Sequence, residues 1–404
     1  MSDLALRLLR HGYAAVARER AAQGPAGETE PMVTRLLGRR AVVVRDPAGV
    51  GLFYDEHVVR RRGAIPPPVA WLLFGRGAVH GLDDQDHLER KALLIDILDR
   101  GSLEPLVADA GRRLDALLDR SSGPVPVFDT LVRAYGPAVL HWAGIDLAQD
   151  KAELVSRRLA EIVDGFGFAG AAYARAWSAR IHADRWAARL VADARAGTWT
   201  PPAGSAVARL AASDLTDRVA GVELLNLLRP TVAVAWLGTF ATVDLARRPE
   251  LRSRLRHDAQ ARWHFAQEVR RTTPFAPVLA GRLRRPARLH DVDLHPGDLV
   301  VLDILGVDLE PARWAQPQSF DPDRFAGEAG DGPGEAAGVE GLVPQGGGPR
   351  TGHRCPGEPL TVALLAETAR VVVERPPRLV GSHDTDLSRI PTLPGGGELR
   401  WARH

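Results

Sequence analysis

The sequence predicts a mainly α-helical protein with small β-sheets, and three observations support this. Between residues 88 and 272, Gly and Pro separate stretches whose apolar residues recur with helical spacing. The stretch from Leu279 to Ile304 instead has short alternating runs interrupted by Pro286, Pro296 and Gly297, which is typical of small strands and hairpins. The composition, with 45% hydrophobic and 25% charged residues, is ordinary for a globular protein and excludes disorder and collagen-like repeats.

The helical stretches can be bounded individually. We expect modest helices at Leu88–Leu98, Leu106–Leu118, Val127–Ala143, Ala152–Ile162 and Pro359–Val373, and longer ones at Tyr173–Ala196, Thr216–Arg247 and Arg252–Thr272. We expect Pro230 to interrupt the longest of these and Pro274 to follow the end of the last. Residues 327–348 are rich in Gly and acidic residues and predict a loop. Because no linker is long enough to divide the chain, we expect one domain over residues 1–404.

The net charge of the chain indicates no macromolecular partner. Lys and Arg number 52 and Asp and Glu number 50, and this net charge of +2 is too balanced to suggest a nucleic-acid-binding surface. Lys91 and Lys151 are the only lysines, and the sequence uses Arg in place of Lys almost everywhere. A single arginine is therefore weaker evidence for a functional site than in most sequences. The segment from Met1 to Arg20 has no apolar core of a signal peptide, and no apolar run of about 18 residues follows it. We therefore expect a cytoplasmic protein without a membrane span.

The single cysteine, Cys355, excludes an internal disulfide framework and a cysteine zinc cluster. It stands in a glycine-rich loop, Gln345 to Glu358, that leads into a predicted helix, and His353 and Arg354 precede it. Positive neighbours and a helix start favour a thiolate, and a thiolate protected in this way suits a heme iron. A buried bystander cysteine is an equally good interpretation of this loop alone. A cysteine hydrolase is less favoured, because His353 is poorly placed to act as its base.

Two further motifs precede the cysteine loop. Glu268 and Arg271 are spaced i,i+3 on one predicted helix, and Arg324 follows in the loop Phe-Asp-Pro-Asp-Arg-Phe. A Glu–Arg pair of this kind is more often an exposed surface pair. The order Glu-x-x-Arg, loop arginine and cysteine loop is more specific, and it indicates a structural clamp.

These three motifs together resemble the C-terminal half of a cytochrome P450, and the similarity extends over essentially the whole chain. The resemblance implies a cytochrome P450-type helical domain in which Cys355 is the axial thiolate of heme b, with Glu268, Arg271 and Arg324 as the clamp. One departure is visible, because Gly348 stands where the superfamily usually has Phe, seven residues before the cysteine. The Gln-Gly-Gly-Gly stretch resembles instead the bacterial fatty-acid peroxygenase and decarboxylase branch.

The longest predicted helix contains Arg229 and Pro230 within an apolar stretch. It lacks the acid–alcohol pair with which monooxygenases of the superfamily deliver protons to bound oxygen. If Arg229 is buried, its charge needs an anion. Taken alone, this dipeptide is more often an arginine whose guanidinium reaches solvent beside a break in the helix. In the peroxygenase branch that the sequence resembles, Arg-Pro binds the substrate carboxylate over the heme, so the resemblance implies this catalytic role for Arg229 and Pro230.

The resemblance also implies a set of residues around the heme. Phe74 and His80 would lie in the distal pocket, and His87, Lys91 and His353 would contact the heme propionates. For the last three, a solvated helix face is the alternative. Histidine at position 80 is typical of a decarboxylating member of the branch and glutamine of hydroxylating members, which favours a mixture of both reactions here.

The resemblance also implies roles for Phe275 and for residues 387–394. Phe275, in Pro-Phe-Ala-Pro, would form a wall of the substrate pocket, with simple core packing as the alternative. Residues 387–394 resemble the terminal β-hairpin of the branch.

The function expected from the resemblance is a hydrogen-peroxide-dependent heme-thiolate peroxygenase acting on fatty acids. It would hydroxylate at the α or β carbon, with or without oxidative decarboxylation to terminal alkenes, and a redox partner would not be required. An O2- and reductase-dependent monooxygenase is the first alternative, a catalytically silent heme- or ligand-binding protein the second, and a helical hydrolase without heme the most distant.

Overall fold

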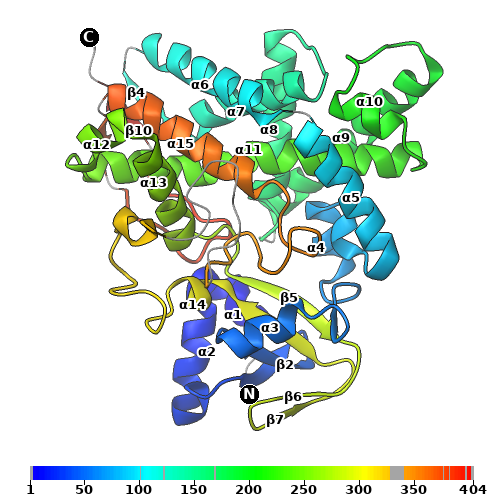
Figure 1. Ribbon diagram of the computed structural model, residues 1–404, viewed down its shortest axis with the longest axis vertical. Coiled ribbons are helices and arrows are strands. Elements are labelled where there is room, and N and C mark those ends of the chain that lie inside the picture. Colours follow the sequence, from blue (N-terminus) through cyan, green and yellow to red (C-terminus); the bar gives the residue numbers. More distant parts are fainter. Residues whose placement is uncertain are drawn as a thin grey trace.

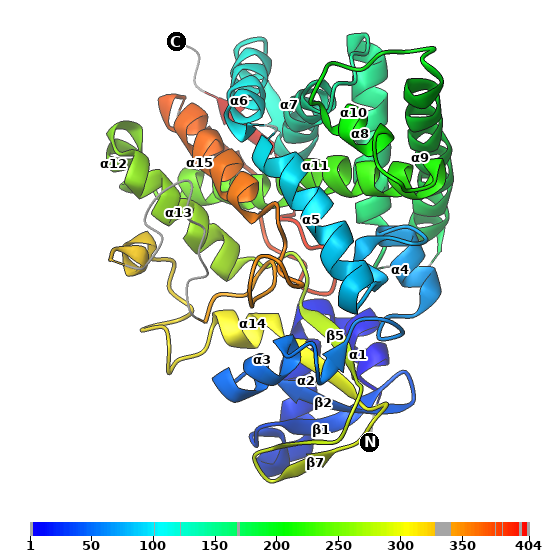
Figure 2. The same ribbon diagram turned by 45° about the vertical axis from the view of Figure 1, so that its right-hand side comes forward.

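The larger part of the molecule is made of helices, and the main β-sheet lies at one end of it together with the N-terminal helices (Figure 1). This computed structural model describes residues 3–100, 102–121, 123–167, 170–327, 341–375, 377–381, 383–395 and 398–401. Turning the molecule shows that α5 crosses in front of α11 and that the cysteine loop leads into α15 between the helical part and the sheet (Figure 2). The mainly helical architecture confirms the predicted fold class.

Most predicted helices are present, with slightly different ends. The helices are α1 Leu4–His11, α2 Ala15–Gln23, α3 Pro47–Tyr54, α4 Pro67–Leu73, α5 Asp84–Arg100, α6 Leu103–Asp119, α7 Val127–Trp142, α8 Gln149–Asp164, α9 Ala171–Ala196, α10 Ala206–Ala211, α11 Asp217–Arg247, α12 Leu251–His257, α13 Ala259–Thr272, α14 Ile304–Asp308 and α15 Glu358–Glu374. The expectation of one helix over residues 252–272 is wrong. The side chain of Asp258 accepts hydrogen bonds from the backbone N–H groups of Gln260 and Ala261, and this cap starts α13 as a separate helix.

Helix α11 is the central element of the helical part. It packs against α7, α9 and α15, and nearly every residue from Ala220 to Leu245 is buried. By length and composition it could cross a membrane, but its apolar stretch is 94% buried inside the protein. The expected interruption at Pro230 is wrong, since the helix continues through it. Packing on several sides outweighs the one backbone hydrogen bond that proline removes.

The main sheet has five strands in the order β1-β2-β8-β5-β3. Its strands are β1 Met32–Leu36, β2 Arg39–Val44, β3 Val59–Arg60, β5 Val278–Leu283 and β8 Leu299–Asp303, and only the β2–β8 pair is parallel. The smaller strands are β4 Pro124–Pro126, β6 Ala287–Leu289, β7 Val292–Leu294, β9 Pro377–Val380 and β10 Glu398–Trp401. The strands expected between residues 279 and 304 are therefore confirmed, whereas the sequence interpretation did not anticipate β1 and β2.

Two expectations concern loops. Residues 387–394 are not themselves strands, which corrects the expected hairpin. They belong to the connection between the antiparallel strands β9 and β10, where a single bridge joins Thr385 to Pro394. Of the loop expected at 327–348, residues 328–340 lie outside the described residues, and residues 341–348 contain turns and one isolated bridge but no helix.

The predicted clamp is present, with Glu268 and Arg271 fully buried on α13 and Arg324 in the short 3₁₀ helix Pro322–Phe325. Glu268 and Arg271 form a two-point ion pair with distances of 2.7 and 2.8 Å, and Arg324 lies 3.2 Å from the same carboxylate. Arg271 also donates to the carbonyls of Asp308 and Pro317 at 3.0 and 2.9 Å. Because every charge in this group meets opposite charge or a carbonyl, burial is tolerated, and α13 is tied to the chain between α14 and the cysteine loop.

Candidate active site

The loop that carries Cys355 is held by Arg270, which lies next to Arg271 on α13. Arg270, which is fully buried, donates to the side-chain oxygen of Gln345 at 2.8 Å and also binds the carboxylate of Glu358. Glu358 accepts a second charged hydrogen bond from Arg354 at 2.6 Å. The backbone N–H of Cys355 donates to the carbonyl of Gln345 at 3.0 Å. These bonds fix both ends of the short segment between Gln345 and α15.

The thiol of Cys355 lies in surroundings unsuited to a nucleophile. Burial raises its pKa, so the neutral thiol is favoured unless a metal ion binds it. Nε2 of Gln345 lies 4.0 Å from Sγ. His353 lies instead 4.0 Å from the carboxylates of Glu56 and Asp83. Among the described residues no histidine contacts Sγ as the base of a cysteine hydrolase would, which leaves metal ligation as the better chemistry.

The unusual glycines before Cys355 pack against one aromatic side chain, Tyr54 at the end of α3. A Cβ atom on Gly347 would lie 2.9 Å from its ring, and one on Gly348 would lie 3.3 Å from its Cβ. Gly348 also has a φ of +76°, which favours glycine. Tyr54, from a distant part of the chain, therefore packs closely where a side chain at position 348 would begin.

Arg229 lies in the middle of α11, and only 4% of its surface is exposed. Its guanidinium donates one long hydrogen bond, 3.3 Å, to the side-chain oxygen of Asn226, while its Nε has no partner. Burial lowers its pKa, and the nearby cation of Arg180 lowers it further. No carboxylate pairs with Arg229 among the described residues, so this charge lacks the anion that burial demands.

Asn226 connects Arg229 to a buried carboxylate one turn earlier in α11. The amide of Asn226 donates to Glu223 at 3.0 Å, and Glu223 also accepts from Arg90 of α5 at 2.8 Å and from the backbone of Val79 at 2.9 Å. Glu223 is therefore already occupied by other donors and cannot neutralise Arg229. The chain of contacts instead fixes the position of Asn226 and, through it, the direction of the guanidinium.

Phe74 and His80 lie together on the same side of the molecule as Arg229. Their rings are stacked, with centroids 4.1 Å apart, and the Phe74 ring lies 5.9 Å from the guanidinium carbon of Arg229. Phe74 follows α4, and His80 lies in a short 3₁₀ helix, Val79–Gly81. Both residues border a pocket of about 610 Å³. Desolvation by the surrounding protein, followed by the cation of Arg229, lowers the pKa of His80 to about 3 although its side chain is open to the pocket, and its imidazole is neutral at physiological pH.

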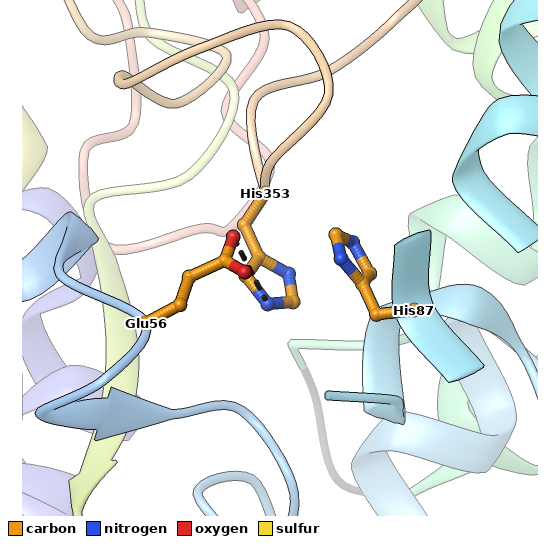
Figure 3. Close-up of side chains that lie close together, drawn as sticks. All are labelled: Glu56, His87 and His353. Carbon is orange, nitrogen blue, oxygen red and sulfur yellow. Dashed lines mark ion pairs between the residues drawn. The ribbon is translucent and has the colours of Figure 1, made fainter. Parts of the chain in front are cut away.

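His87, His353 and Glu56 converge from α5, the cysteine loop and the end of α3 (Figure 3). The two imidazole rings are stacked, with centroids 3.9 Å apart, and the figure shows Glu56 approaching His353 from the other side. Their potential ligand atoms lie within 4.8 Å of one another, which is close enough for a metal ion. Burial lowers the pKa of His87 to about 4 and that of His353 to about 2, and the nearby cation of Lys91 contributes to both.

Lys91 and Arg61 make this region more suitable for an anion than for a metal ion. Lys91 is buried, and its ammonium donates to the carbonyl of Arg354 beside Cys355. Arg61 lies 4.0 Å from the ring centroid of Phe53, and its Nη1 is buried without a partner. Nδ1 of His87 is likewise buried without a partner. The ammonium of Lys91 and the unpartnered ring nitrogen of His87 therefore favour an anion beside the cysteine loop.

Phe275 has a different position from that of Phe74 and His80. It packs against the helical core and takes part in ring contacts with Phe166 and with Trp236 of α11, at centroid distances of 6.4 and 6.1 Å. It does not border the 610 Å³ pocket. The described contacts are those of core packing, and its role as a wall of the substrate site stays a prediction.

Comparisons with known proteins agree with this geometry. The family model described as cytochrome P450 matches residues 264–364, which include the clamp and the cysteine loop. The structure of cytochrome P450SP alpha in complex with (R)-ibuprophen is 30% identical, with a TM-score of 0.89, and the match covers 100% of this chain and 99% of that chain. The chain belongs to the cytochrome P450 family. The fold and the predicted family are thereby confirmed.

Cytochrome P450 OleT is a second similar protein. Its ligand-free structure is 27% identical, with a TM-score of 0.90, and the match covers 99% of this chain and 97% of that chain. A single-residue variant of OleT in complex with arachidonic acid matches with the same identity, TM-score and coverage. Together with P450SP alpha, these structures confirm the predicted peroxygenase and decarboxylase branch.

A cytochrome P450 fold implies heme iron, and the residues of this chain fit that group. Its only cysteine lies partly buried at the predicted ligand position. Orphaned donors on Arg61 and His87 are available to anionic substituents. The donor set therefore suits one soft thiolate ligand for iron and cationic or N–H partners for carboxylates.

Sequence reasoning missed several residues of this site. Arg270, Tyr54, Asn226, Glu223 and Arg61 were not predicted, although each contacts a predicted residue or its loop. The i,i+3 spacing of Glu223, Asn226 and Arg229 is a sequence signal for the polar chain on α11. Tyr54 and Arg61 gave no such signal, since their contacts join segments far apart in the sequence.

A substitution of Gly348 tests the packing of the cysteine loop against Tyr54. We expect Gly348→Ala to lower the free energy of unfolding by about 2–3 kcal/mol, because positive φ costs about 1 kcal/mol or more and the new Cβ also presses on Tyr54. Gly38→Ala is the matched control, since Gly38 has nearly the same φ but no neighbouring atom within 4 Å. Equal losses for the two variants in urea unfolding would contradict a role for the Tyr54 contact.

Proposed function

We propose that this protein is a hydrogen-peroxide-dependent heme-thiolate peroxygenase acting on fatty acids. The observation that carries this proposal is the buried guanidinium of Arg229, which has no carboxylate partner among the described residues and lies beside Phe74 and His80. A free carboxylic acid in the adjoining space would supply the missing anion. Two similar proteins have carboxylic acids bound, arachidonic acid in OleT and (R)-ibuprophen in P450SP alpha.

The heme would be held by residues on two sides. Cys355 would supply the thiolate ligand to iron, and His87, Lys91, His353 and Arg61 would interact with the propionates. When bound, the heme-thiolate supplies the oxidising chemistry, because electron donation from the thiolate favours cleavage of an O–O bond. Arg270 and Gln345 keep the cysteine loop in place, as their hydrogen bonds indicate.

Arg229 would orient the substrate by a charge-assisted, two-point contact with its carboxylate. Fixing one end of a flexible chain holds the α and β carbons nearest the reacting centre, and such positioning is a large source of rate and selectivity. The substrate carboxylate would also replace the acid–alcohol pair that α11 lacks, moving a proton between the two peroxide oxygens as a general acid–base group. Pro230 leaves a backbone carbonyl of α11 without its usual N–H partner beside this position.

Two net reactions follow from this arrangement. In hydroxylation, a C–H bond at the α or β carbon becomes C–OH, and hydrogen peroxide is reduced to one water molecule. In decarboxylation, the acid loses a β hydrogen and CO2, and peroxide is reduced to two water molecules as a terminal alkene forms. Neutral His80, stacked on Phe74 at the pocket, is the residue that we assign to the balance between them.

The remaining expectations fit this function. A peroxide-dependent enzyme needs no reductase, so we propose that no redox partner is required. We also propose a cytoplasmic location, with the apolar helix α11 serving as a core helix. A reductase-dependent monooxygenase would require a proton-delivering acid–alcohol pair, and Arg229-Pro230 occupies that part of α11. A silent ligand-binding protein would consume no peroxide with any acid.

The anchoring role of Arg229 can be tested by Arg229→Ala. We expect peroxide-driven turnover of fatty acids to fall at least about 100-fold, because a charged hydrogen bond worth about 1.5–3 kcal/mol and the orientation it gives are both lost. Heme content and the absorption of the ferrous–CO complex should be unchanged. Arg218→Gln, an exposed arginine on the same helix, serves as the control and should retain full activity. Full peroxide-driven activity in Arg229→Ala would refute the anchor.

His80→Gln tests the proposed control of the product. We expect the ratio of alkene to hydroxy acid to fall, because the imidazole that borders the pocket is removed. Since desolvation keeps the pKa of His80 near 3, the product ratio of the unmodified protein should stay constant between pH 5 and 8. Product analysis by gas chromatography checks both statements. A transition near pH 6.5 that disappears in His80→Gln would show that His80 titrates there, contrary to this prediction.

A further inference from the structure

The 610 Å³ pocket that begins at Phe74 and His80 ends at the surface beside the main sheet. Its walls come from the chain around α4 on one side and from strands β5 and β8 on the other. The apolar part of the wall is formed by Ile65, Ala70, Trp71, Leu82, Ala280 and Leu299. A volume in this range accommodates a ligand of moderate size, and the apolar wall suits an alkyl chain. The tail of an acid anchored at Arg229 would point along this pocket.

The outer part of the pocket is strongly cationic. Arg39, Arg61, Arg62 and Arg282 line it, and no Asp or Glu does. The Asp83 carboxylate accepts from the backbone N–H groups of Arg61 and Arg62 at 2.7 and 3.0 Å. The side chain of Arg62 lies 3.7 Å from Asp86, where both side chains are largely exposed. Among the described residues, neither of these carboxylates pairs with the guanidinium of Arg282.

The side chain of Arg282 has no hydrogen bond or ion pair within the described part of the chain, and its Nε is buried. Positions that a Cβ would take on Gly63 and Gly297 lie 3.6 and 3.7 Å from its terminal nitrogens, so only glycine backbone flanks the guanidinium there. Across the β3–β5 pair, Arg282 is directly opposite Arg60, whose Nε is also buried without a partner. Like charges opposite each other in a sheet destabilise it unless an anion lies between them.

We propose that the outer pocket arginines Arg39, Arg62 and Arg282, with Arg60 opposite Arg282 in the sheet, bind a second anionic group at the far end of the substrate. The preferred substrates are then long-chain α,ω-dicarboxylic acids. This inference rests on the proposed function, since Arg229 takes the first carboxylate. A carrier conjugate of the acid is excluded at the inner end, because Arg229 requires that carboxylate to be free. Only the outer end is available for a further charge.

The test compares a series of saturated α,ω-diacids with their monomethyl esters on the heme-loaded protein. Each ester keeps one carboxylate for Arg229 and has a neutral outer end of nearly the same length. We expect a diacid of matching length to show a KM and a calorimetric Kd about tenfold lower than its ester, the gain of one charged hydrogen bond. Arg282→Gln should remove this difference and leave the ester within about twofold of its original values.

Arg285→Gln is the matched control, because Arg285 is exposed close to Arg282 in the sequence but does not line the pocket. It should leave the preference for diacids intact. Equal affinities of diacid and ester at every length would overturn the inference. The inference would also be overturned if Arg282→Gln weakened the binding of diacid and ester equally, because that would indicate a general attraction of acids to the pocket.

The same experiment distinguishes failure of the second subsite from failure of the proposed function. If esters are oxidised with peroxide but diacids are not preferred, the peroxygenase proposal stands and the second subsite is wrong. If neither is oxidised, the peroxygenase proposal is wrong, and the calorimetric comparison of diacid with ester still decides the subsite.

Discussion

A positive charge buried in the longest helix is the constraint on which the functional side of this structure depends. Arg229 is surrounded by protein, close to a second arginine, and held by one long hydrogen bond to Asn226. Proteins seldom bury a charge without a partner, because its lost hydration must be offset. The neighbouring carboxylate, Glu223, is occupied by Arg90, Val79 and Asn226. Among the described residues Arg229 therefore has no carboxylate partner, which is why we propose that its anion is the substrate.

The opposite side of the site depends on rigidity. Neighbouring residues of α13 have separate tasks, since Arg271 ties the helix to the chain after α14 and Arg270 ties it to the cysteine loop. Tyr54 supports the same loop from the sheet end of the molecule. A metal-binding thiol needs such support because its orientation, and not its basicity, must be set before iron binds. The hydrogen bonds of the loop hold Cys355 at the position where we propose that it binds iron.

The sequence predicted those parts that depend on local order. Helix positions follow from apolar spacing, and the three motifs in the C-terminal half follow from fixed residue order, so the helical fold, the clamp and the position of Cys355 could be inferred. Pro230 misled the reading of α11, because packing maintained a helix that local preference would interrupt. The cap at Asp258 was overlooked, although an Asp before a helical stretch is a start signal.

Contacts between distant segments could not be read in this way. Tyr54 lies nearly 300 residues from Gly348, and Arg60 meets Arg282 only because β3 pairs with β5. The strong bias toward arginine hid the outer pocket arginines, since any one of them is ordinary for this sequence. Within the described part of the chain, the lack of an acidic partner for Arg60 and Arg282 distinguishes these two from the many arginines that are paired.

The most direct test of this account is a crystal structure of the heme-loaded protein with a saturated fatty acid. It should place the carboxylate of the acid about 2.7–2.9 Å from the guanidinium nitrogens of Arg229, with the alkyl chain running past Phe74 toward the pocket beside α4. A carboxylate bound at the outer arginines, with the alkyl end beside Arg229, would contradict it.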